Sequence, residues 1–235
     1  MTHQSEPTQK LSHVLWIAGS PCSGKSSISH TIARIYVFID YHADAWARNH
    51  FARKVAAGDA EAQAFLKMGM DQRWIERPVE VLVQETIASW TKEFDMVIED
   101  LLALPRENFI VAEGNFFPAC VAPYLSSPHQ AIWLVPTDDF CEQARRQKRA
   151  ELSRRQKRHG VYNEGSDPEK RLQNLIARDC QLARYVEQQA EEQHLPVYKV
   201  DGSRSLAEMT DLVERHFDPY LIECFRGMKE RSENA

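Results

Sequence analysis

Residues 15–27 of the chain read LWIAGSPCSGKSS and place Gly19, Gly24, Lys25 and Ser26 at the spacing G-x-x-x-x-G-K-S. This spacing is typical of a phosphate-binding loop. The glycines let several backbone N–H groups point inward, the lysine reaches the outer phosphates, and the serine hydroxyl ligates Mg²⁺. Such a loop lies between a buried strand and the N-terminus of a helix, where unpaired N–H groups favour an anion. The motif therefore constrains the fold as well as the ligand.

The residues on both sides of this loop predict the required strand and helix. HVLWIAG is a largely apolar run typical of a buried strand, and Ile28, Ile32 and Ile35 recur at helical spacing after the loop. An accidental loop of small residues is the alternative, but it would not require these flanks. We predict that the loop binds a nucleotide through Gly19, Ser20, Pro21, Cys22, Ser23, Gly24, Lys25, Ser26 and Ser27.

Five apolar runs, separated by helical patterns, indicate an α/β fold with a parallel sheet. Ligands of such sheets bind beyond the carboxyl ends of the strands, so the residues that follow each run are the first candidates for a site. The predicted strands are Val14–Ala18, Tyr36–Ile39, Phe109–Ala112, Ala131–Val135 and Val197–Val200.

Composition and charge narrow the class of protein. The 235 residues are 43% hydrophobic and 27% charged, which is typical of a globular protein with a substantial core. The net charge of −5 disfavours bulk attraction to nucleic acid or to an anionic membrane. No apolar run approaches the length of a membrane span, and the N-terminal MTHQSEPTQK lacks the apolar core of a secretory signal. The five cysteines are scattered without a C-x-x-C pair, which favours a reducing cytoplasm over a disulfide framework or a zinc ribbon.

About seventy residues separate the second and third predicted strands, far more than a crossover helix needs. Apolar residues from Val79 to Phe94 recur at helical spacing, and Pro78 is placed to start that helix. We interpret the segment of about 42–105 as a helical insertion over the top of the sheet, where an acceptor substrate binds. A purely structural cap is the alternative.

Eight arginine or lysine residues fall between Arg145 and Arg158. Beside a phosphate loop, such a run favours a mobile lid, at about residues 141–170, whose arginines neutralise transferring phosphates. Arg145 and Arg149 are the first candidates for this role. A solvated helix face and a nucleic-acid-binding arm are the alternatives, and the acidic net charge disfavours the arm.

Acidic residues follow the second and third predicted strands. Asp40 ends the second strand, where a carboxylate could take the proton of an attacking hydroxyl or hold Mg²⁺. We assign the proton to Asp40 and interpret Asp44 as the N-cap of the next helix. The string Asp40-x-His42-x-Asp44 resembles a metal cluster, but without further spaced ligands we interpret His42 as a partly buried polar residue. Glu113 ends the third strand and is predicted to hold Mg²⁺ together with Ser26.

With these residues in place, the chain resembles the P-loop small-molecule kinases, the group that contains nucleoside monophosphate kinases, shikimate kinase and gluconate kinase. GSPCSGKS resembles the nucleotide loop, AEGNFFP resembles the third-strand segment that adenylate kinases write as Asp-Gly-Phe-Pro, and VDGS resembles the last-strand loop beside the adenine. The arginine-rich run and Arg178-Asp179 lie where that group has its lid and a following arginine-bearing helix. The resemblance covers most of the chain in order.

The resemblance implies a P-loop NTPase-type three-layer sandwich with a five-stranded parallel sheet, an acceptor-binding insertion and a lid. A single domain would span about residues 11–220, followed by a C-terminal helix and tail at 221–235. Asp218-Pro219 is expected to start that last helix. One departure is the stretch between Lys25 and Asp40, which has no Gly, Pro, Asn or Asp to turn the first helix into the second strand. Either this connection is unusually tight or a few residues are absent from the sequence.

The expected activity is transfer of the γ-phosphate of ATP, with Mg²⁺, to a hydroxyl of a small-molecule acceptor in the cytoplasm. A phosphate acceptor, as in nucleotide kinases, is an alternative that relies on arginines rather than on a general base. A nucleotide-dependent switch protein that binds RNA or a partner through the basic run is a second alternative. The sequence does not identify the acceptor.

Overall fold

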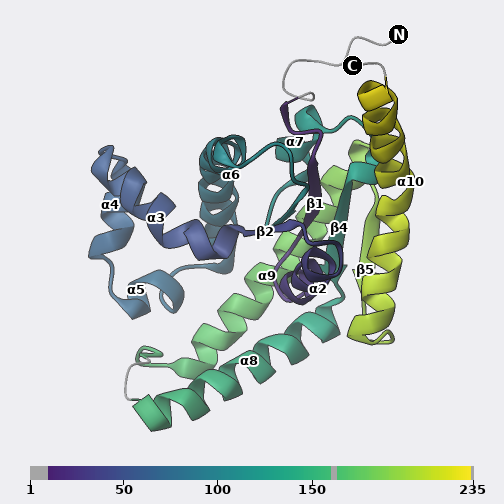
Figure 1. Cartoon of the computed structure of the whole chain (residues 1–235). Helices are drawn as coiled ribbons and strands as arrows, with labels where there is room; N and C mark the ends of the chain where they lie inside the picture. Colours follow the sequence, from purple (N-terminus) through teal and green to yellow (C-terminus); the bar gives the residue numbers. More distant parts are fainter. Residues whose placement is uncertain (1–9, 160–162, 234–235) are drawn as a thin grey trace.

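The computed structural model describes residues 10–159 and 163–233 of the chain. Its centre is one sheet of five parallel strands in the order β2-β3-β1-β4-β5 (Figure 1). The α/β class and the five-stranded parallel sheet predicted from the apolar runs are therefore confirmed. The strands are β1 (Val14–Gly19), β2 (Ile39–His42), β3 (Ile110–Glu113), β4 (Ala131–Pro136) and β5 (Val197–Val200).

One face of the sheet is covered by helices α6 (Val79–Ala103) and α9 (Pro168–Glu192). Their apolar sides pack on Trp16 of β1 and Trp133 of β4, which are both fully buried. The indole N–H of Trp133 donates a hydrogen bond to the backbone oxygen of Phe116, at 3.0 Å. This bond satisfies the one polar group that the Trp133 side chain brings into the core.

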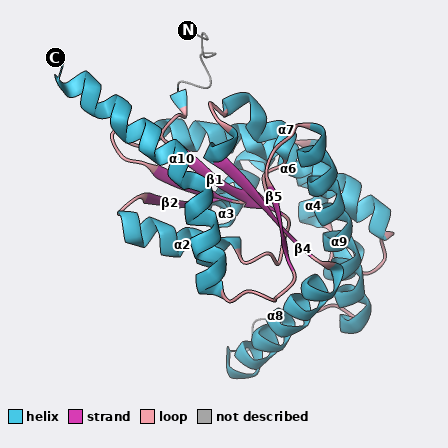
Figure 2. Ribbon diagram, turned by 90° about the vertical axis from the view of Figure 1, so that its right-hand side faces the viewer, coloured by secondary structure: helices cyan, strands magenta, loops and turns pink. Residues whose placement is uncertain are grey.

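The opposite face of the sheet is covered by helices α2 (Lys25–Tyr36) and α10 (Leu206–Glu233), so the molecule has three layers (Figure 2). These helices pack on Leu15, Ile17 and Val111, which alternate with the residues that face the other way. Because both faces are covered, β1 and β4 are buried along their whole length. Continuous apolar runs, rather than alternating ones, follow from this arrangement.

The second strand begins later than the sequence pattern indicates. Tyr36, the first residue of the predicted strand, is the last residue of α2, and Val37 adopts a left-handed conformation with a φ of 58°. The N–H of Phe38 then donates to the carbonyl oxygen of Ala33, at 2.9 Å, and β2 starts at Ile39. The connection is therefore tight, and Asp40 lies inside the strand instead of ending it. The other predicted strands differ from the structure by one residue at one or both ends or coincide with it.

The segment between β2 and β3 is helical, as expected, and forms the lobe on the left of Figure 1. Pro78 is the N-cap of α6, one residue before the position that the sequence suggests for a helix start. The other helices of this insertion are α3 (Ala43–Ala56), α4 (Ala60–Lys67) and α5 (Met70–Trp74).

The arginine-rich run, residues 145–158, lies on helix α8 (Asp138–His159), which leads to α9. Residues 160–162 of the predicted lid lie outside the described residues. A short helix, α7 (Pro118–Val121), and two 3₁₀ turns, at Ala122–Tyr124 and Pro128–Gln130, connect β3 to β4. In the described part of the chain, every helix is too short or too polar to cross a membrane.

The helix expected to start at Asp218-Pro219 is not a separate element. Pro219 lies inside α10, which is continuous from Leu206. Phe217, Tyr220 and Leu221 are all buried against the sheet. Their packing extends the helix through Pro219, which removes one N–H donor but leaves the apolar side intact.

The left-handed residue at the end of α2 gives a stability prediction. Val37 is 86% exposed, so its side chain contributes little packing, while a left-handed φ costs an L-residue about 1–2 kcal/mol. We expect Val37→Gly to raise the free energy of unfolding by about 1 kcal/mol, measured by urea denaturation. The matched control is Ile35→Gly, at an exposed position inside α2, which should lower it by about 1 kcal/mol. Equal losses in both variants would contradict the left-handed conformation of Val37.

Candidate functional site

Residues 19–26, which run from the last residue of β1 into the first turn of α2, are here named the glycine loop. Gly19 has a φ of 137°, and a Cβ at this position would lie 2.0 Å from the carbonyl oxygen of Leu134. Only glycine fits where the loop leaves the sheet. Gly24, the N-cap of α2, has a φ of 80°, which curls the loop around the start of the helix. The unpaired N–H groups of the first turn of α2 thus lie beside the loop, an arrangement that suits an anion.

Lys25 places its ammonium group in the middle of the glycine loop. Its Nζ donates to the carbonyl oxygen of Ser20 at 2.7 Å, to the Ser23 hydroxyl at 3.3 Å and to the Asn115 side-chain oxygen at 3.2 Å. Lys25 is buried, and this burial lowers its pKa, while the nearby Glu113 carboxylate opposes the shift. The ammonium group is therefore a buried cation held by neutral oxygens that phosphate oxygens could replace.

Ser26 and Glu113 provide two oxygen atoms next to this cation that could bind a metal ion. The Ser26 hydroxyl donates to Glu113 Oε2 at 3.1 Å, and Glu113 is 5% exposed. Oxygen ligands are those that Mg²⁺ prefers, so the pair fits the predicted magnesium role. Asn115 was not predicted from the sequence, although it follows β3 at the carboxyl edge of the sheet, where site residues are expected.

Asp40 is directed toward helix α2. Its Oδ1 accepts a hydrogen bond from the Ser29 hydroxyl at 3.0 Å. Its Oδ2 lies 3.1 Å from His30 Nδ1 and 2.9 Å from His42 Nε2. His42 is partly buried, as predicted, and its Nδ1 lies 3.0 Å from Glu113 Oε2. That Asp40 takes the proton of the acceptor hydroxyl stays a prediction. In the structure its carboxylate contacts side chains of α2 and of His42.

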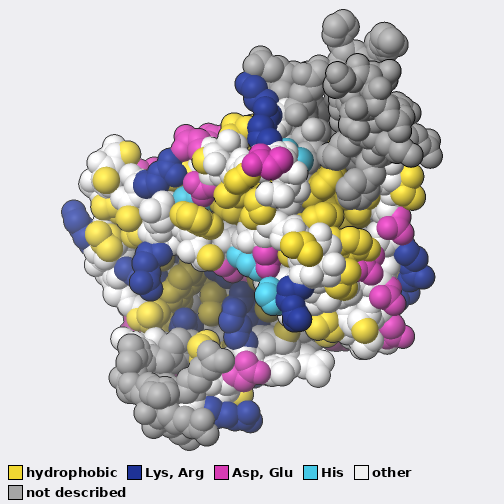
Figure 3. Space-filling view, viewed as in Figure 1, with side chains coloured by type: hydrophobic (Ala, Val, Ile, Leu, Met, Phe, Trp, Pro, Cys, Tyr) yellow, Lys and Arg dark blue, Asp and Glu magenta, His cyan; other side chains and the backbone are white. Residues whose placement is uncertain are grey.

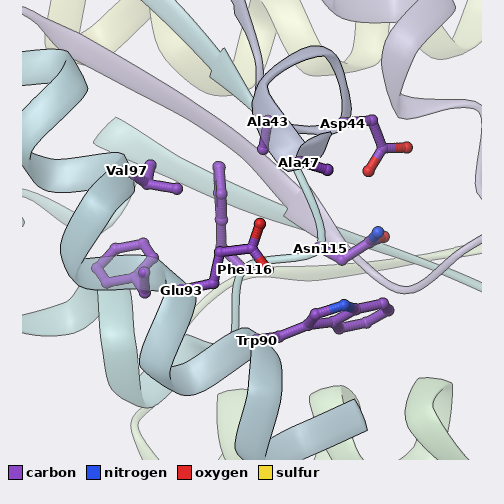
Figure 4. Close-up of a pocket in the computed structure, with 9 residues that line it drawn as sticks. Ala43, Asp44, Ala47, Trp90, Glu93, Val97, Asn115 and Phe116 are labelled. Carbon is purple, nitrogen blue, oxygen red and sulfur yellow. The ribbon is translucent and has the colours of Figure 1, made fainter. Parts of the chain in front are cut away.

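The prediction that Asp44 is the N-cap of α3 is wrong. His42 takes that position, and Asp44 lies in the first turn of the helix. Asp44 lines a cavity of about 70 Å³ together with Asn115, Trp90 and Glu93. Figure 4 shows Asp44 and Trp90 on opposite sides of this cavity, with Asn115 between them. The structure thus brings Asp44 near the Lys25 contact residue Asn115.

A second cavity, of about 370 Å³, lies within the helical insertion and against α9. Figure 3 shows a hollow with hydrophobic and basic side chains between the insertion and α8. Trp90 lines both the second cavity and the cavity beside Asp44, so the two spaces adjoin the same side chain. The aromatic residues that line the second cavity are Phe51, Phe65, Trp74 and Trp90.

The predicted lid arginines are each paired with carboxylates. Arg145 forms an ion pair with the fully buried Asp179. Arg149 donates to Glu164 at 3.0 Å and to Glu169 at 2.8 Å. These contacts hold α8 against α9 and the residues before it. If Arg145 and Arg149 contact phosphates, as predicted, they must exchange these carboxylate partners for phosphate oxygens.

Cys22, one of the residues predicted to bind the nucleotide, has a thiol with a lowered pKa. A hydrogen bond from the Cys141 side chain and the charge of Arg145 lower its pKa to about 7, against the opposing effect of burial. Burial raises the pKa of Cys180, on α9, to about 11. The loop therefore carries a thiol that is partly ionised near pH 7.

No protein-family model matches the chain, and no curated protein matches its sequence. The candidate site accordingly stands on the geometry of the glycine loop and of the residues around it.

The low pKa of Cys22 gives a chemical prediction, because the thiolate is the reactive form of cysteine. Alkylation of Cys22 by iodoacetamide should reach half its maximal rate near pH 7, measured by mass spectrometry of the modified peptide. ATP with Mg²⁺ should slow this reaction, since Cys22 lies in the glycine loop. Cys180 is the internal control and should react far more slowly. A half-maximal rate at the pH of an ordinary thiol would refute the perturbation.

Proposed function

We propose that the chain is a P-loop kinase that transfers the γ-phosphate of ATP, with Mg²⁺, to a hydroxyl group of a small molecule. The observation that carries this proposal is the convergence of the Lys25 ammonium and the Ser26–Glu113 oxygen pair at the glycine loop, with the Asp44 carboxylate lining the adjoining cavity that contains the Lys25 partner Asn115. A cation, a metal-binding oxygen pair and a base are the parts that phosphoryl transfer to a hydroxyl requires.

The glycine loop and Lys25 would bind the phosphates of the nucleotide. Backbone N–H groups at the start of α2 and the buried ammonium offset negative charge without a large rearrangement. Mg²⁺, held by Ser26 and Glu113, would supply electrostatic stabilisation of the transferring group. Two observations support the fit of these residues to a nucleotide and Mg²⁺. Gly19 passes so close to β4 that only glycine is possible there, and Ser26 and Glu113 supply oxygen ligands.

Asp44, rather than Asp40, is the general base that the geometry supports. Asp40 already accepts from Ser29 and contacts two histidines, on the side of the sheet covered by α2. Asp44 is exposed and lines the cavity that also contains Asn115. A hydroxyl bound in that cavity would have its proton within reach of this carboxylate.

The aromatic cavity of the insertion favours an acceptor with a planar or apolar body. Each cation that lines it, among the described residues, is paired with a carboxylate, so a phosphorylated acceptor would have to displace an ion pair, whereas a hydroxyl acceptor would not. These pairs are Lys54 with Glu93, Arg77 with Glu85, Lys92 with Glu61, and Arg178 with Asp179. A hydroxyl acceptor is therefore preferred over a nucleotide.

Nucleotide binding can be tested before an acceptor is known. Lys25→Ala removes a charge-assisted contact with the phosphates, so the binding free energy of ATP-Mg²⁺ should weaken by about 1.5–3 kcal/mol in calorimetry. Lys67→Ala, at an exposed position of α4, is the matched control and should bind like the unmodified chain. Equal affinities of Lys25→Ala and Lys67→Ala would rule out the phosphate role of the loop.

The identity of the base can be tested once an acceptor is found by measuring ADP release over a panel of sugars, nucleosides, nucleotides and antibiotics. Asp44→Asn should lower turnover by about 10²–10⁴-fold with little change in ATP affinity, because the amide cannot accept a proton. Asp40→Asn, the matched control, should lose much less. The reverse ranking would return the role to Asp40, and small losses in both variants would favour a phosphate acceptor.

A further inference from the structure

Three side chains outside the phosphate site converge on one point of the surface. His30 comes from α2, and Asp40 and His42 come from the same face of β2. Their ligand atoms, His30 Nδ1, Asp40 Oδ2 and His42 Nε2, all lie within 4.8 Å of one another. Figure 3 shows histidine side chains beside acidic ones near the middle of this face. The group is here named the His–Asp–His cluster.

The spacing of these atoms matches that of ligands around a transition ion. In a tetrahedral zinc site with metal–ligand distances near 2.0–2.1 Å, neighbouring ligand atoms lie about 3.3 Å apart. Asp40 Oδ2 lies 3.1 Å from His30 Nδ1 and 2.9 Å from His42 Nε2. An ion between them would need only small movements of the two rings. The exposed side of His30 leaves room for a water as a fourth ligand.

Hydrogen bonds fix two of the three ligands in the orientation that metal binding requires. The Ser29 hydroxyl donates to Asp40 Oδ1 and so leaves Oδ2 directed at the histidines. His42 Nδ1 lies 3.0 Å from Glu113 Oε2 and can donate its proton there, which leaves Nε2 as the ligand atom. A carboxylate behind a metal-binding histidine is a recurrent feature of such sites.

A simple ion pair is the competing explanation of the cluster. It accounts for His42, which lies between Asp40 and Glu113. It accounts poorly for His30, whose side chain is 61% exposed and gains little from a surface ion pair. Two imidazoles directed at one carboxylate oxygen are better explained by a cation that all three share.

We propose that His30, Asp40 and His42 bind a divalent first-row transition ion such as Zn²⁺, at a site distinct from the oxygen ligands of the phosphate site. The donor set of two imidazoles and one carboxylate suits zinc and related ions, whereas Mg²⁺ prefers oxygen ligands. The inference holds whether or not the chain transfers phosphate.

The test is a zinc titration of the metal-free full chain in competition with a chromophoric zinc indicator, without nucleotide and with excess Mg²⁺. We expect one zinc per chain. His30→Gln, which alters only an exposed side chain, should lower the zinc affinity by at least about tenfold, and so should Asp40→Asn. His194→Gln, at another exposed position, is the matched control and should bind zinc like the unmodified chain.

A second group of possible ligands, Cys22, Cys141 and Asp179, requires its own control. Cys22→Ser should retain the zinc site, and Co²⁺ bound in place of zinc should show no thiolate charge-transfer absorption. Zinc binding that survives in His30→Gln but is lost in Cys22→Ser would overturn the proposal. Failure of the unmodified chain to bind zinc would overturn it as well. Neither result would affect the nucleotide prediction, which uses a different ligand.

Discussion

The site depends on the hydrogen bonds that the buried ammonium group of Lys25 donates. A cation with so little exposure is costly unless oxygens surround it, and three acceptor oxygens from two segments do so. Through these bonds the glycine loop is tied to Asn115, just beyond β3. The loop, the end of β3 and the start of α2 consequently form one polar unit at the carboxyl edge of the sheet, and the cavity beside Asp44 opens from that unit.

The sheet and the loop could be predicted because their causes are local. Strands buried on both faces must be continuously apolar, so β1 and β4 stand out in the sequence. Backbone geometry requires glycine at fixed positions of the loop. Gly19 is such a position, because its backbone passes too close to Leu134 for a side chain. Glu113 was found for the same reason, since it lies at the end of an apolar run.

The arrangement around β2 could not be predicted, because its causes are not local. Nothing in the sequence marks Val37 as left-handed, so the strand was predicted to begin at Tyr36, and Asp40 was placed at its end instead of inside it. His30 joins Asp40 only through the packing of α2 beside β2, so spacing along the chain could not reveal it. Pro219 likewise resembled a helix start until the burial of its neighbours was known.

One oxygen atom, Glu113 Oε2, accepts from Ser26 and also lies against His42. The two environments of this carboxylate are therefore thermodynamically linked. A ligand that moves the Glu113 oxygen away from His42 changes the affinity of the imidazole for its own ligand. Conversely, a ligand of the imidazole changes the affinity of the Glu113 oxygen for its ligand. Linkage requires both effects on affinity to be equal in size. If the proposed ligands bind at both positions, binding at His42 would therefore report on binding at the glycine loop.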